Sequence, residues 1–288
     1  MSDTSDKPPI LESIASSNQV FRCVHAIAFV GIWMAIGWLF HLDANSYLLI
    51  GVPLVIVFQV FVRKKSLVSL WVRDADRFRL DIGGVVIALA VAVWPTINII
   101  QSFKSSAWSS HLPEMLWMVC CIGGSFCAAF SLRHFTGETW KSLLFCMATA
   151  GIIGCGIMVA GVLVRKHSII PNYQQALVGL SSFGLYFPVS FILEEVVFRG
   201  AIDSHVHQLG DSRSWLSALF VSALWGLWHL PILGVKVILQ LVALIILMPC
   251  IHIATGVFLS LSWRRSGNLA VPAIVHATID AVRNMLLS

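Results

Sequence analysis

The sequence predicts an all-α fold, a polytopic transmembrane helical bundle with eight or nine spans. Of the 288 residues, 58% are hydrophobic and only 11% are charged, and the mean hydropathy is +0.85. Soluble domains carry about 25% charged residues, so the charge content alone indicates a membrane protein. The apolar residues are also gathered in runs near the length of about 20 residues that an α-helix needs to cross a bilayer.

Nine apolar runs are the candidate spans, and they follow a polar segment, residues 1–22, that we expect in the cytoplasm. In chain order they are Cys23–Phe40, Tyr47–Val62, Ile82–Ile100, Leu112–Leu132, Ser142–Val164, Ala176–Leu209, Leu216–Leu233, Val235–Trp263 and Leu269–Leu287. The sixth run is long, the second is short, and Pro249 inside the eighth favours a tilt or a break. Eight and nine spans therefore both stay open.

The positive charges predict the orientation. With the N-terminus in the cytoplasm, most lysines and arginines fall on the cytoplasmic side, which favours nine spans and an external C-terminus. The net charge of +5 is explained by these loops, so no nucleic-acid partner is expected. We expect a multi-pass integral protein of a bacterial cytoplasmic (inner) membrane, with the lipid bilayer as its surroundings.

The longest polar connection, from Arg63 to Asp81, mixes aromatic residues with arginines. Such a pattern is typical of an interfacial helix lying on anionic headgroups. An ordinary cytoplasmic loop is the alternative interpretation, and the sequence favours neither.

Ionisable residues inside the apolar runs are the strongest functional signal. Each costs about 2.5–3.5 kcal/mol at membrane depth on insertion scales, so a cluster of them indicates a site. The cluster consists of three pairs, each four residues apart and therefore on one helix face: Glu195 and Arg199, Trp225 and His229, and His276 and Asp280. Glu194 precedes the first pair and points about 100° away from Glu195 on an α-helix.

These residue types predict hydrolysis. Arg199 would keep Glu195 charged as a structural pair, which leaves Glu194 as the general base for water. His229 and His276 are candidate donors to a developing oxyanion, and Asp280 would orient His276 or bind water. A zinc site formed by His229, His276 and Glu194 is the alternative, so no cofactor and a zinc ion both stay open.

The remaining histidines and cysteines give weaker signals. We expect the seven cysteines to be small apolar fillers of the bundle, since no metal-type spacing occurs among them. Four histidines have no acidic partner nearby in the sequence, namely His25, His134, His167 and His252. We expect His205 and His207, at the end of the sixth run, to lie on the solvated surface.

The three motifs in this order resemble the CPBP family of intramembrane proteases, which are related to the type II CAAX prenyl endopeptidase and to bacteriocin-processing and immunity proteins. The resemblance covers roughly residues 176–287, and it divides the chain into N-terminal transmembrane helices, residues 23–175, and a catalytic region, residues 176–288. The family commonly has Phe where this chain has Trp225 and Asn where it has Asp280. Both departures are mild.

The resemblance implies an α-helical endopeptidase with six site residues: Glu194, Glu195, Arg199, His229, His276 and Asp280. The implied partner is a peptide or protein substrate that arrives from the membrane or from the cytoplasmic side. A prenylated CAAX end is one such substrate, and a leader peptide or a membrane protein is another. A membrane scaffold or immunity protein that uses the cluster as a structural lock, and a transporter, are the competing functions.

Overall fold

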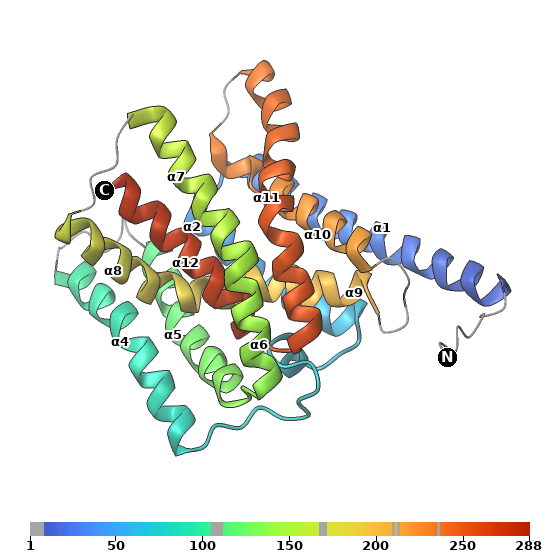
Figure 1. The fold of residues 1–288 in the computed structure, drawn as a ribbon, viewed down its shortest axis with the longest axis horizontal. Helices are drawn as coiled ribbons and strands as arrows, with labels where there is room; N and C mark the ends of the chain where they lie inside the picture. Colours follow the sequence, from blue (N-terminus) through green and yellow to red (C-terminus); the bar gives the residue numbers. More distant parts are fainter. Residues whose placement is uncertain (1–8, 105–111, 167–171, 209–210, 212–213, 235–236) are drawn as a thin grey trace.

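In the computed structural model, the regular structure of the described residues is helical, apart from one isolated bridge. The structure describes residues 9–104, 112–166, 172–208, 211, 214–234 and 237–288. In chain order, the first half contains α1 (Pro9–Leu39), α2 (Ala44–Leu49), α3 (Gly51–Val57), η1 (Phe58–Val62), η2 (Leu67–Leu70), α4 (Ile82–Lys104), α5 (Leu112–Arg133), α6 (Gly137–Cys146), η4 (Met147–Gly151) and α7 (Ile152–Lys166). The second half contains α8 (Tyr173–Val189), η5 (Ser190–Asp203), α9 (Ser204–Val206), α10 (Ser214–Trp228), η6 (Leu230–Leu233), α11 (Ile238–Ser266) and α12 (Ala270–Leu287) (Figure 1).

Eight helical stretches in the described part of the chain are long and apolar enough to cross a membrane, which makes this an integral multi-pass membrane protein. They are Asn18–Leu39, Ala44–Val62, Ile82–Gln101, Leu112–Arg133, Gly137–Val164, Tyr173–Val206, Trp215–Leu233 and Ile238–Ser266. The predicted run ends Leu209 and Val235 lie outside the described residues. The orientation of the bundle stays a prediction.

The predicted ninth span is α12, which carries the last of the polar motifs. It contacts α8, α7, α6, α11 and η5, and in Figure 1 it crosses the middle of the bundle. Most of its side chains are buried, although it is too polar to count among the eight apolar stretches. Its surroundings are therefore largely protein, and this suits a helix that carries ionisable residues.

Two expected helix limits differ in the structure. The first helix begins at Pro9, so it includes most of the segment that the composition assigns to a polar N-terminus. The eighth run forms one continuous helix, α11, which passes through Pro249 without a break. A proline removes one helical hydrogen bond, but the 29-residue helix continues on both sides of Pro249 despite this missing bond.

The connection after Arg63 is a packed loop, which agrees with the second of the two interpretations left open by the sequence and not with an interfacial helix. It forms only the short 3₁₀ helix η2 and one antiparallel bridge, from Val72 to Asn268. Leu70 is buried at its centre, and the Leu70 carbonyl oxygen would lie 2.6 Å from a Cβ added to Gly200. The segment therefore packs against η5, and a side chain at Gly200 would push it away.

The turn between α11 and α12 sets the position of α12. Gly267 has a φ of +62° and ends α11, with its N–H donated to the carbonyl of Trp263. Asn268 follows: its side-chain oxygen accepts from the N–H of Ala270, and its amide donates to the carbonyl of Ser131 on α5. These contacts satisfy the first turn of α12 and tie it to a neighbouring helix.

Candidate active site

Both glutamates and the arginine lie on η5, which is a π-helix of 14 residues and not the α-helix that the spacing assumed. In a π-helix each N–H bonds to the carbonyl five residues back, and such segments occur frequently at functional sites. The side chains four apart still meet: Arg199 Nε lies 3.4 Å from Glu195 Oε2. The rule of 100° per residue does not apply to this helix.

Glu195 and Arg199 form a fully buried pair that faces α12. Glu195 Oε1 accepts a hydrogen bond of 2.9 Å from His276 Nδ1, while its other oxygen faces Arg199. The Arg199 guanidinium lies over the indole of Trp225, 4.3 Å from the ring centroid. Its nitrogens make no hydrogen bond to any residue that the structure describes, so the carboxylate and the aromatic ring together compensate its charge.

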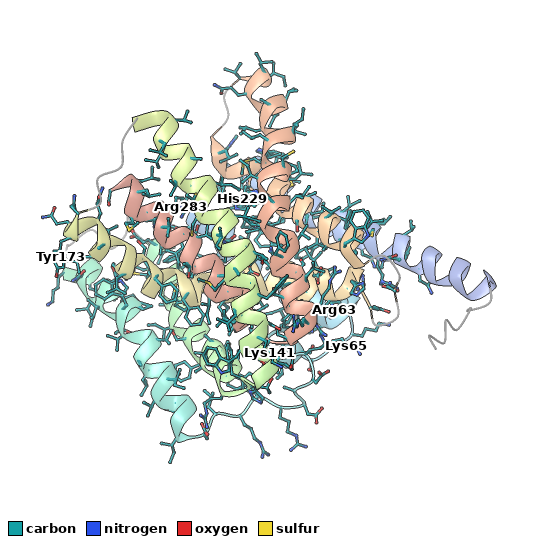
Figure 2. The ribbon with its side chains drawn as sticks, viewed as in Figure 1. Arg63, Lys65, Lys141, Tyr173, His229 and Arg283 are labelled. Atoms are coloured by element: carbon teal, nitrogen blue, oxygen red, sulfur yellow. The ribbon has the colours of Figure 1, made fainter. Side chains whose placement is uncertain are left out.

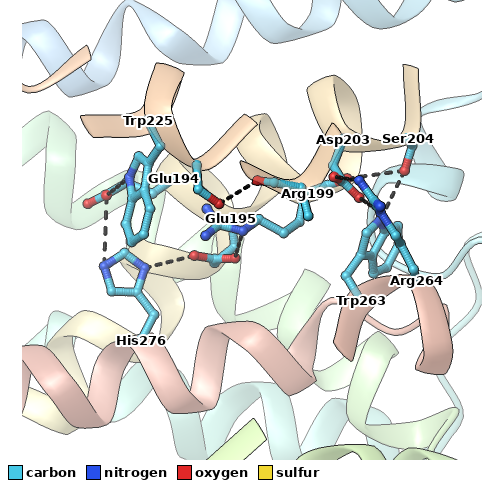
Figure 3. A network of polar contacts seen from close by, with 11 residues as sticks. Glu194, Glu195, Arg199, Asp203, Ser204, Trp225, Trp263, Arg264 and His276 are labelled. Carbon is cyan, nitrogen blue, oxygen red and sulfur yellow. Dashed lines mark hydrogen bonds and ion pairs between the residues drawn. The ribbon is translucent and has the colours of Figure 1, made fainter. Parts of the chain in front are cut away.

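Glu194 points toward nitrogen atoms of two other helices (Figure 3). Its Oε2 atom accepts a 3.2 Å hydrogen bond from Trp225 Nε1. The Nε2 atoms of His229 and His276 each lie 3.9 Å from the same oxygen. Three helices, η5, α10 and α12, therefore converge on one carboxylate oxygen.

The C-terminal end of α10 fixes the ring of His229. Its Nδ1 lies 2.8 Å from the carbonyl oxygen of Trp225, which can only accept, so Nδ1 carries the proton and Nε2 faces Glu194. The helix ends at Trp228, whose carbonyl accepts a 2.8 Å hydrogen bond from the Tyr47 hydroxyl. Tyr47 thereby anchors the turn that carries His229.

Asp280 lies one helical turn after His276, between that histidine and Arg283. Its Oδ2 atom is 3.6 Å from His276 Nε2, and its Oδ1 atom is 2.9 Å from Arg283 Nη1. The ion pair with Arg283 is the shorter contact. Asp280 therefore contributes negative charge near His276 and is itself held by a cation.

A cavity of about 460 Å³ opens beside Glu194. Glu194, His229, His276 and Asp280 line it, whereas the fully buried Glu195 and Arg199 do not. The rest of the wall comes mainly from apolar residues of α7, η6 and α11, among them Ile157, Met158, Ile232, Leu233, Met248 and Ile251. The cavity therefore has a floor of polar side chains, which includes Glu194, and a wall of mainly apolar side chains.

Sequence reasoning missed two residues of this cavity. His252 on α11 has its ring centroid 4.4 Å from that of His229 and 4.6 Å from that of Trp225. It has no acidic residue near it in the sequence, so no spacing could connect it to the motifs. Arg283 could have been predicted to pair with Asp280, because it follows Asp280 by three residues on the same helix.

The expectation that His205 is solvated is wrong. Its side chain is buried, with Nε2 3.3 Å from His25 Nδ1 on α1 and its ring against Phe58. His207 also differs from the expectation, since its Nδ1 atom is buried and has no hydrogen-bond partner among the described residues. The end of the sixth run packs against α1, and periodicity within one run does not predict such a contact. His167 lies outside the described residues.

The fit of a metal ion can be judged from the arrangement of ligand atoms. In the part of the chain that the structure describes, no group of three or more His, Cys, Asp or Glu side chains is arranged to hold one. Glu194 Oε2 lies 3.9 Å from each histidine Nε2, whereas two ligands that are each about 2.0–2.2 Å from a tetrahedral zinc ion lie about 3.3–3.6 Å from each other. The arrangement does not fit a preformed zinc site, and we derive no step through a metal.

Comparison with known proteins connects this geometry to a family. Residues 176–282 match the sequence model of the family described as type II CAAX prenyl endopeptidase Rce1-like. The resemblance seen in the motifs is confirmed. The matched region runs from α8 into α12 and contains all six candidate site residues. No curated protein and no solved structure matches the chain.

Proposed function

We propose that this protein is an intramembrane endopeptidase in which Glu194 activates the water that cleaves a peptide bond. The single observation that carries the proposal is the convergence of Trp225 Nε1, His229 Nε2 and His276 Nε2 on one oxygen of Glu194, at the floor of a cavity. The Rce1-like match supports a protease, because it covers the segment that builds this floor.

The first step needs a base, and Glu194 is the carboxylate that the cavity exposes. Its Oε2 atom takes one proton from a water molecule, and the resulting hydroxide attacks the carbonyl carbon of the peptide bond. His229 carries its own proton on Nδ1, so its Nε2 accepts a hydrogen bond from the same water and orients it. The 3.9 Å separation between Glu194 and His229 leaves both groups able to contact one water.

The negative charge that develops on the carbonyl oxygen needs a donor, and His276 is placed to supply it. Three carboxylates surround its ring: Glu195 at 2.9 Å, Asp280 at 3.6 Å and Glu194 at 3.9 Å. These charges favour the doubly protonated imidazolium. Its Nδ1–H then bonds to Glu195, and its Nε2–H faces the cavity, where it donates to the oxyanion.

The second step breaks the carbon–nitrogen bond. Glu194, protonated in the first step, gives that proton to the departing nitrogen, so that the products are a carboxylic acid and an amine and the carboxylate is restored. Glu195 and Asp280 do not contact the reacting atoms in this scheme. They hold His276 in its charged form, and Arg199 balances the charge of Glu195.

The cavity supports a substrate with an apolar portion. Its wall of aliphatic and methionine side chains fits an extended apolar peptide or a CAAX-like end better than a hydrophilic loop. We propose a membrane-associated peptide or protein as substrate, reaching the cavity from the membrane or from the cytoplasmic side.

Glu194→Gln keeps the size and the hydrogen-bonding atoms of the side chain but removes the base. We expect cleavage to fall by about 10²–10⁴-fold, the usual contribution of general base catalysis. The measurement uses the full chain in proteoliposomes with a peptide library of membrane-associated and CAAX-type sequences, and mass spectrometry identifies the new termini. Glu138→Gln is the matched control, because Glu138 is exposed on α6. Full cleavage by folded Glu194→Gln protein would favour the structural-lock function.

A further inference from the structure

A second cavity, of about 430 Å³, lies at the opposite end of η5 from Glu194. Its lining includes Arg63, Lys65, Arg73, Asp203, His207 and Arg264. Figure 2 shows Arg63 and Lys65 well away from His229 and Arg283, which belong to the first cavity. The two cavities share no lining residue.

The second cavity lies where three membrane-crossing stretches end. Arg63 directly follows the stretch that ends at Val62, and His207 follows the one that ends at Val206. Arg264 lies in the last turn of α11. Residues at such ends lie at the level of the lipid headgroups. The cavity is therefore open to the polar interface and not to the bilayer core.

Cationic side chains outnumber the carboxylates in the lining. Arg63, Lys65, Arg73 and Arg264 stand against Asp74 and Asp203. Asp203 is already neutralised, because both of its oxygens bond to Arg264 at 2.6 and 2.9 Å (Figure 3). Asp74 is exposed. Among the described residues, the remaining three cations form no ion pair with a buried carboxylate, although Asp203 acts on Arg63 and Arg73 at longer range.

The two other arginines bond only to neutral acceptors. Arg63 Nη1 donates to the side chain of Gln59 and to the carbonyl of Gly200, at 2.6 and 2.7 Å. Arg73 donates to the carbonyls of Trp263 and Arg264, at 3.0 and 2.9 Å. Among the described residues, neither arginine forms an ion pair with a carboxylate. Each guanidinium therefore keeps N–H groups and a full charge for a ligand.

Burial makes these charges costly in the absence of an anion. Burial is the main reason why the pKa of Arg63 is lowered to about 10; the nearby charge of Asp203 opposes this effect, and the charge of Arg73 adds to it. Burial likewise lowers the pKa of Arg73. A bound anion would relieve this cost, because it supplies the missing counter-charge. His207 also lines this cavity, and its buried Nδ1 atom has no hydrogen-bond partner in the part of the chain that the structure describes.

We propose that this cavity is a binding site for a phosphate group, supplied by an anionic lipid headgroup or by a soluble phosphate. Guanidinium groups match phosphate oxygens in geometry as well as in charge, and lysine adds a point charge at the rim. The position at the ends of membrane helices is typical of basic pockets that bind lipid headgroups. The site does not depend on the proposed peptidase reaction.

A matched pair of lysines tests the site. Lys65 lines the cavity and Lys64, its exposed neighbour, does not. The full-length protein in neutral detergent is titrated with dioleoyl phosphatidylglycerol or dioleoyl phosphatidylcholine, and native mass spectrometry gives the dissociation constant.

We expect Lys65→Gln to weaken phosphatidylglycerol binding about fivefold, which is the effect of one charge near the headgroups, and Lys64→Gln to leave this binding unchanged. Arg63→Gln, checked for folding by its Tm, is expected to weaken binding about tenfold or more.

A second arm distinguishes the sources of phosphate. Inorganic phosphate competes with the lipid in one titration, and sodium chloride of equal ionic strength replaces it in the other. Lipid binding that depends on Lys65 assigns the site to a headgroup, and binding of phosphate alone with the same dependence assigns it to a soluble ligand. Equal binding of both lipids, or equal losses for Lys64→Gln and Lys65→Gln, would overturn the proposal.

Discussion

Trp225 is one of the two positions at which this chain departs from the motif it resembles, and its indole makes a contact in the structure that phenylalanine could not make. Its indole N–H donates to Glu194 Oε2 at 3.2 Å, and phenylalanine has no atom to replace it. The ring also lies under Arg199 and edge-on to His276. Trp225 therefore positions the carboxylate of Glu194, the proposed base, and is also part of the packing.

Replacing Trp225 with phenylalanine separates these two roles. Trp225→Phe keeps an aromatic ring beneath Arg199 but frees the Glu194 carboxylate to rotate. A hydrogen bond to a charged group contributes about 1.5–3 kcal/mol, so we expect kcat to fall about tenfold or more while KM changes little. Steady-state cleavage kinetics measure both values. The control is Trp140→Phe on the exposed face of α6, and an unchanged kcat for Trp225→Phe would show that the indole N–H has no such role.

Only some of the side-chain contacts in the candidate site could be predicted from the sequence. The spacing of four residues placed Glu195 near Arg199 and His276 near Asp280, and the structure has both contacts. It could not show that His276 would bridge the two neighbouring glutamates, because that contact joins residues 81 positions apart. It also could not show which nitrogen of His229 faces the cavity, since a backbone carbonyl decides it.

At the scale of elements, the placement of η5 depends on close backbone contacts with its neighbours. A Cβ on Gly124 of α5 would lie 2.5 Å from the carbonyl oxygen of Pro188, which is two residues before η5 begins. Gly123, the preceding residue, has nothing within 4 Å of the same added atom. These two adjacent glycines thus differ in what an added side chain would meet: Gly124 is buried against Pro188, and Gly123 is exposed.

This difference predicts opposite outcomes for two alanine substitutions. Gly124→Ala forces α5 and α8 apart, and we expect it to cost about 1–3 kcal/mol of stability and to reduce cleavage by displacing Glu194. Gly123→Ala meets no neighbour and removes the low helix propensity of glycine, so we expect a neutral or slightly stabilising effect. Thermal unfolding in detergent compares the two. Equal Tm values would mean that the α5–α8 approach does not hold η5 in place.

Helix type and loop packing are the parts of the fold that composition could not predict. Apolar run lengths located the membrane stretches well, because burial in lipid needs a fixed length. They could not distinguish the π-helix η5 from an α-helix, since the two differ only in backbone bonding. Nor could they show that the loop after Arg63 packs against Gly200, which is a contact between distant parts of the chain.

At the scale of the whole molecule, ionisable groups from three helices meet inside a bundle whose buried side chains are mostly apolar. The helix that carries His276 crosses the middle of that bundle, where α8, α7, α6 and α11 shield it. Aromatic side chains of α1 and α2 support the turn after α10, through Trp33 and Tyr47. The N-terminal half of the chain therefore serves as a scaffold for the site in the C-terminal half.

The assembled site also predicts how activity responds to metal removal. Since no group of three or more His, Cys, Asp or Glu side chains in the described region is arranged to hold a metal ion, we expect cleavage to need no metal ion. Dialysis against a chelator should leave kcat within about twofold, and metal analysis of the active protein should show no stoichiometric zinc. Loss of cleavage on chelation, restored by added zinc, would instead support His229, His276 and Glu194 as ligands.

The central claim is that Glu194 and His276 act as one unit on one peptide bond, and a double-mutant cycle tests it most directly. Glu194→Gln, His276→Gln and the double variant are compared with the wild type in the same cleavage assay, after Tm measurements confirm folding. Because residues that act as a unit are strongly non-additive, we expect the double variant to be no slower than the slower single variant. If the two losses instead multiply, the residues act independently and the account of a shared reaction centre is wrong.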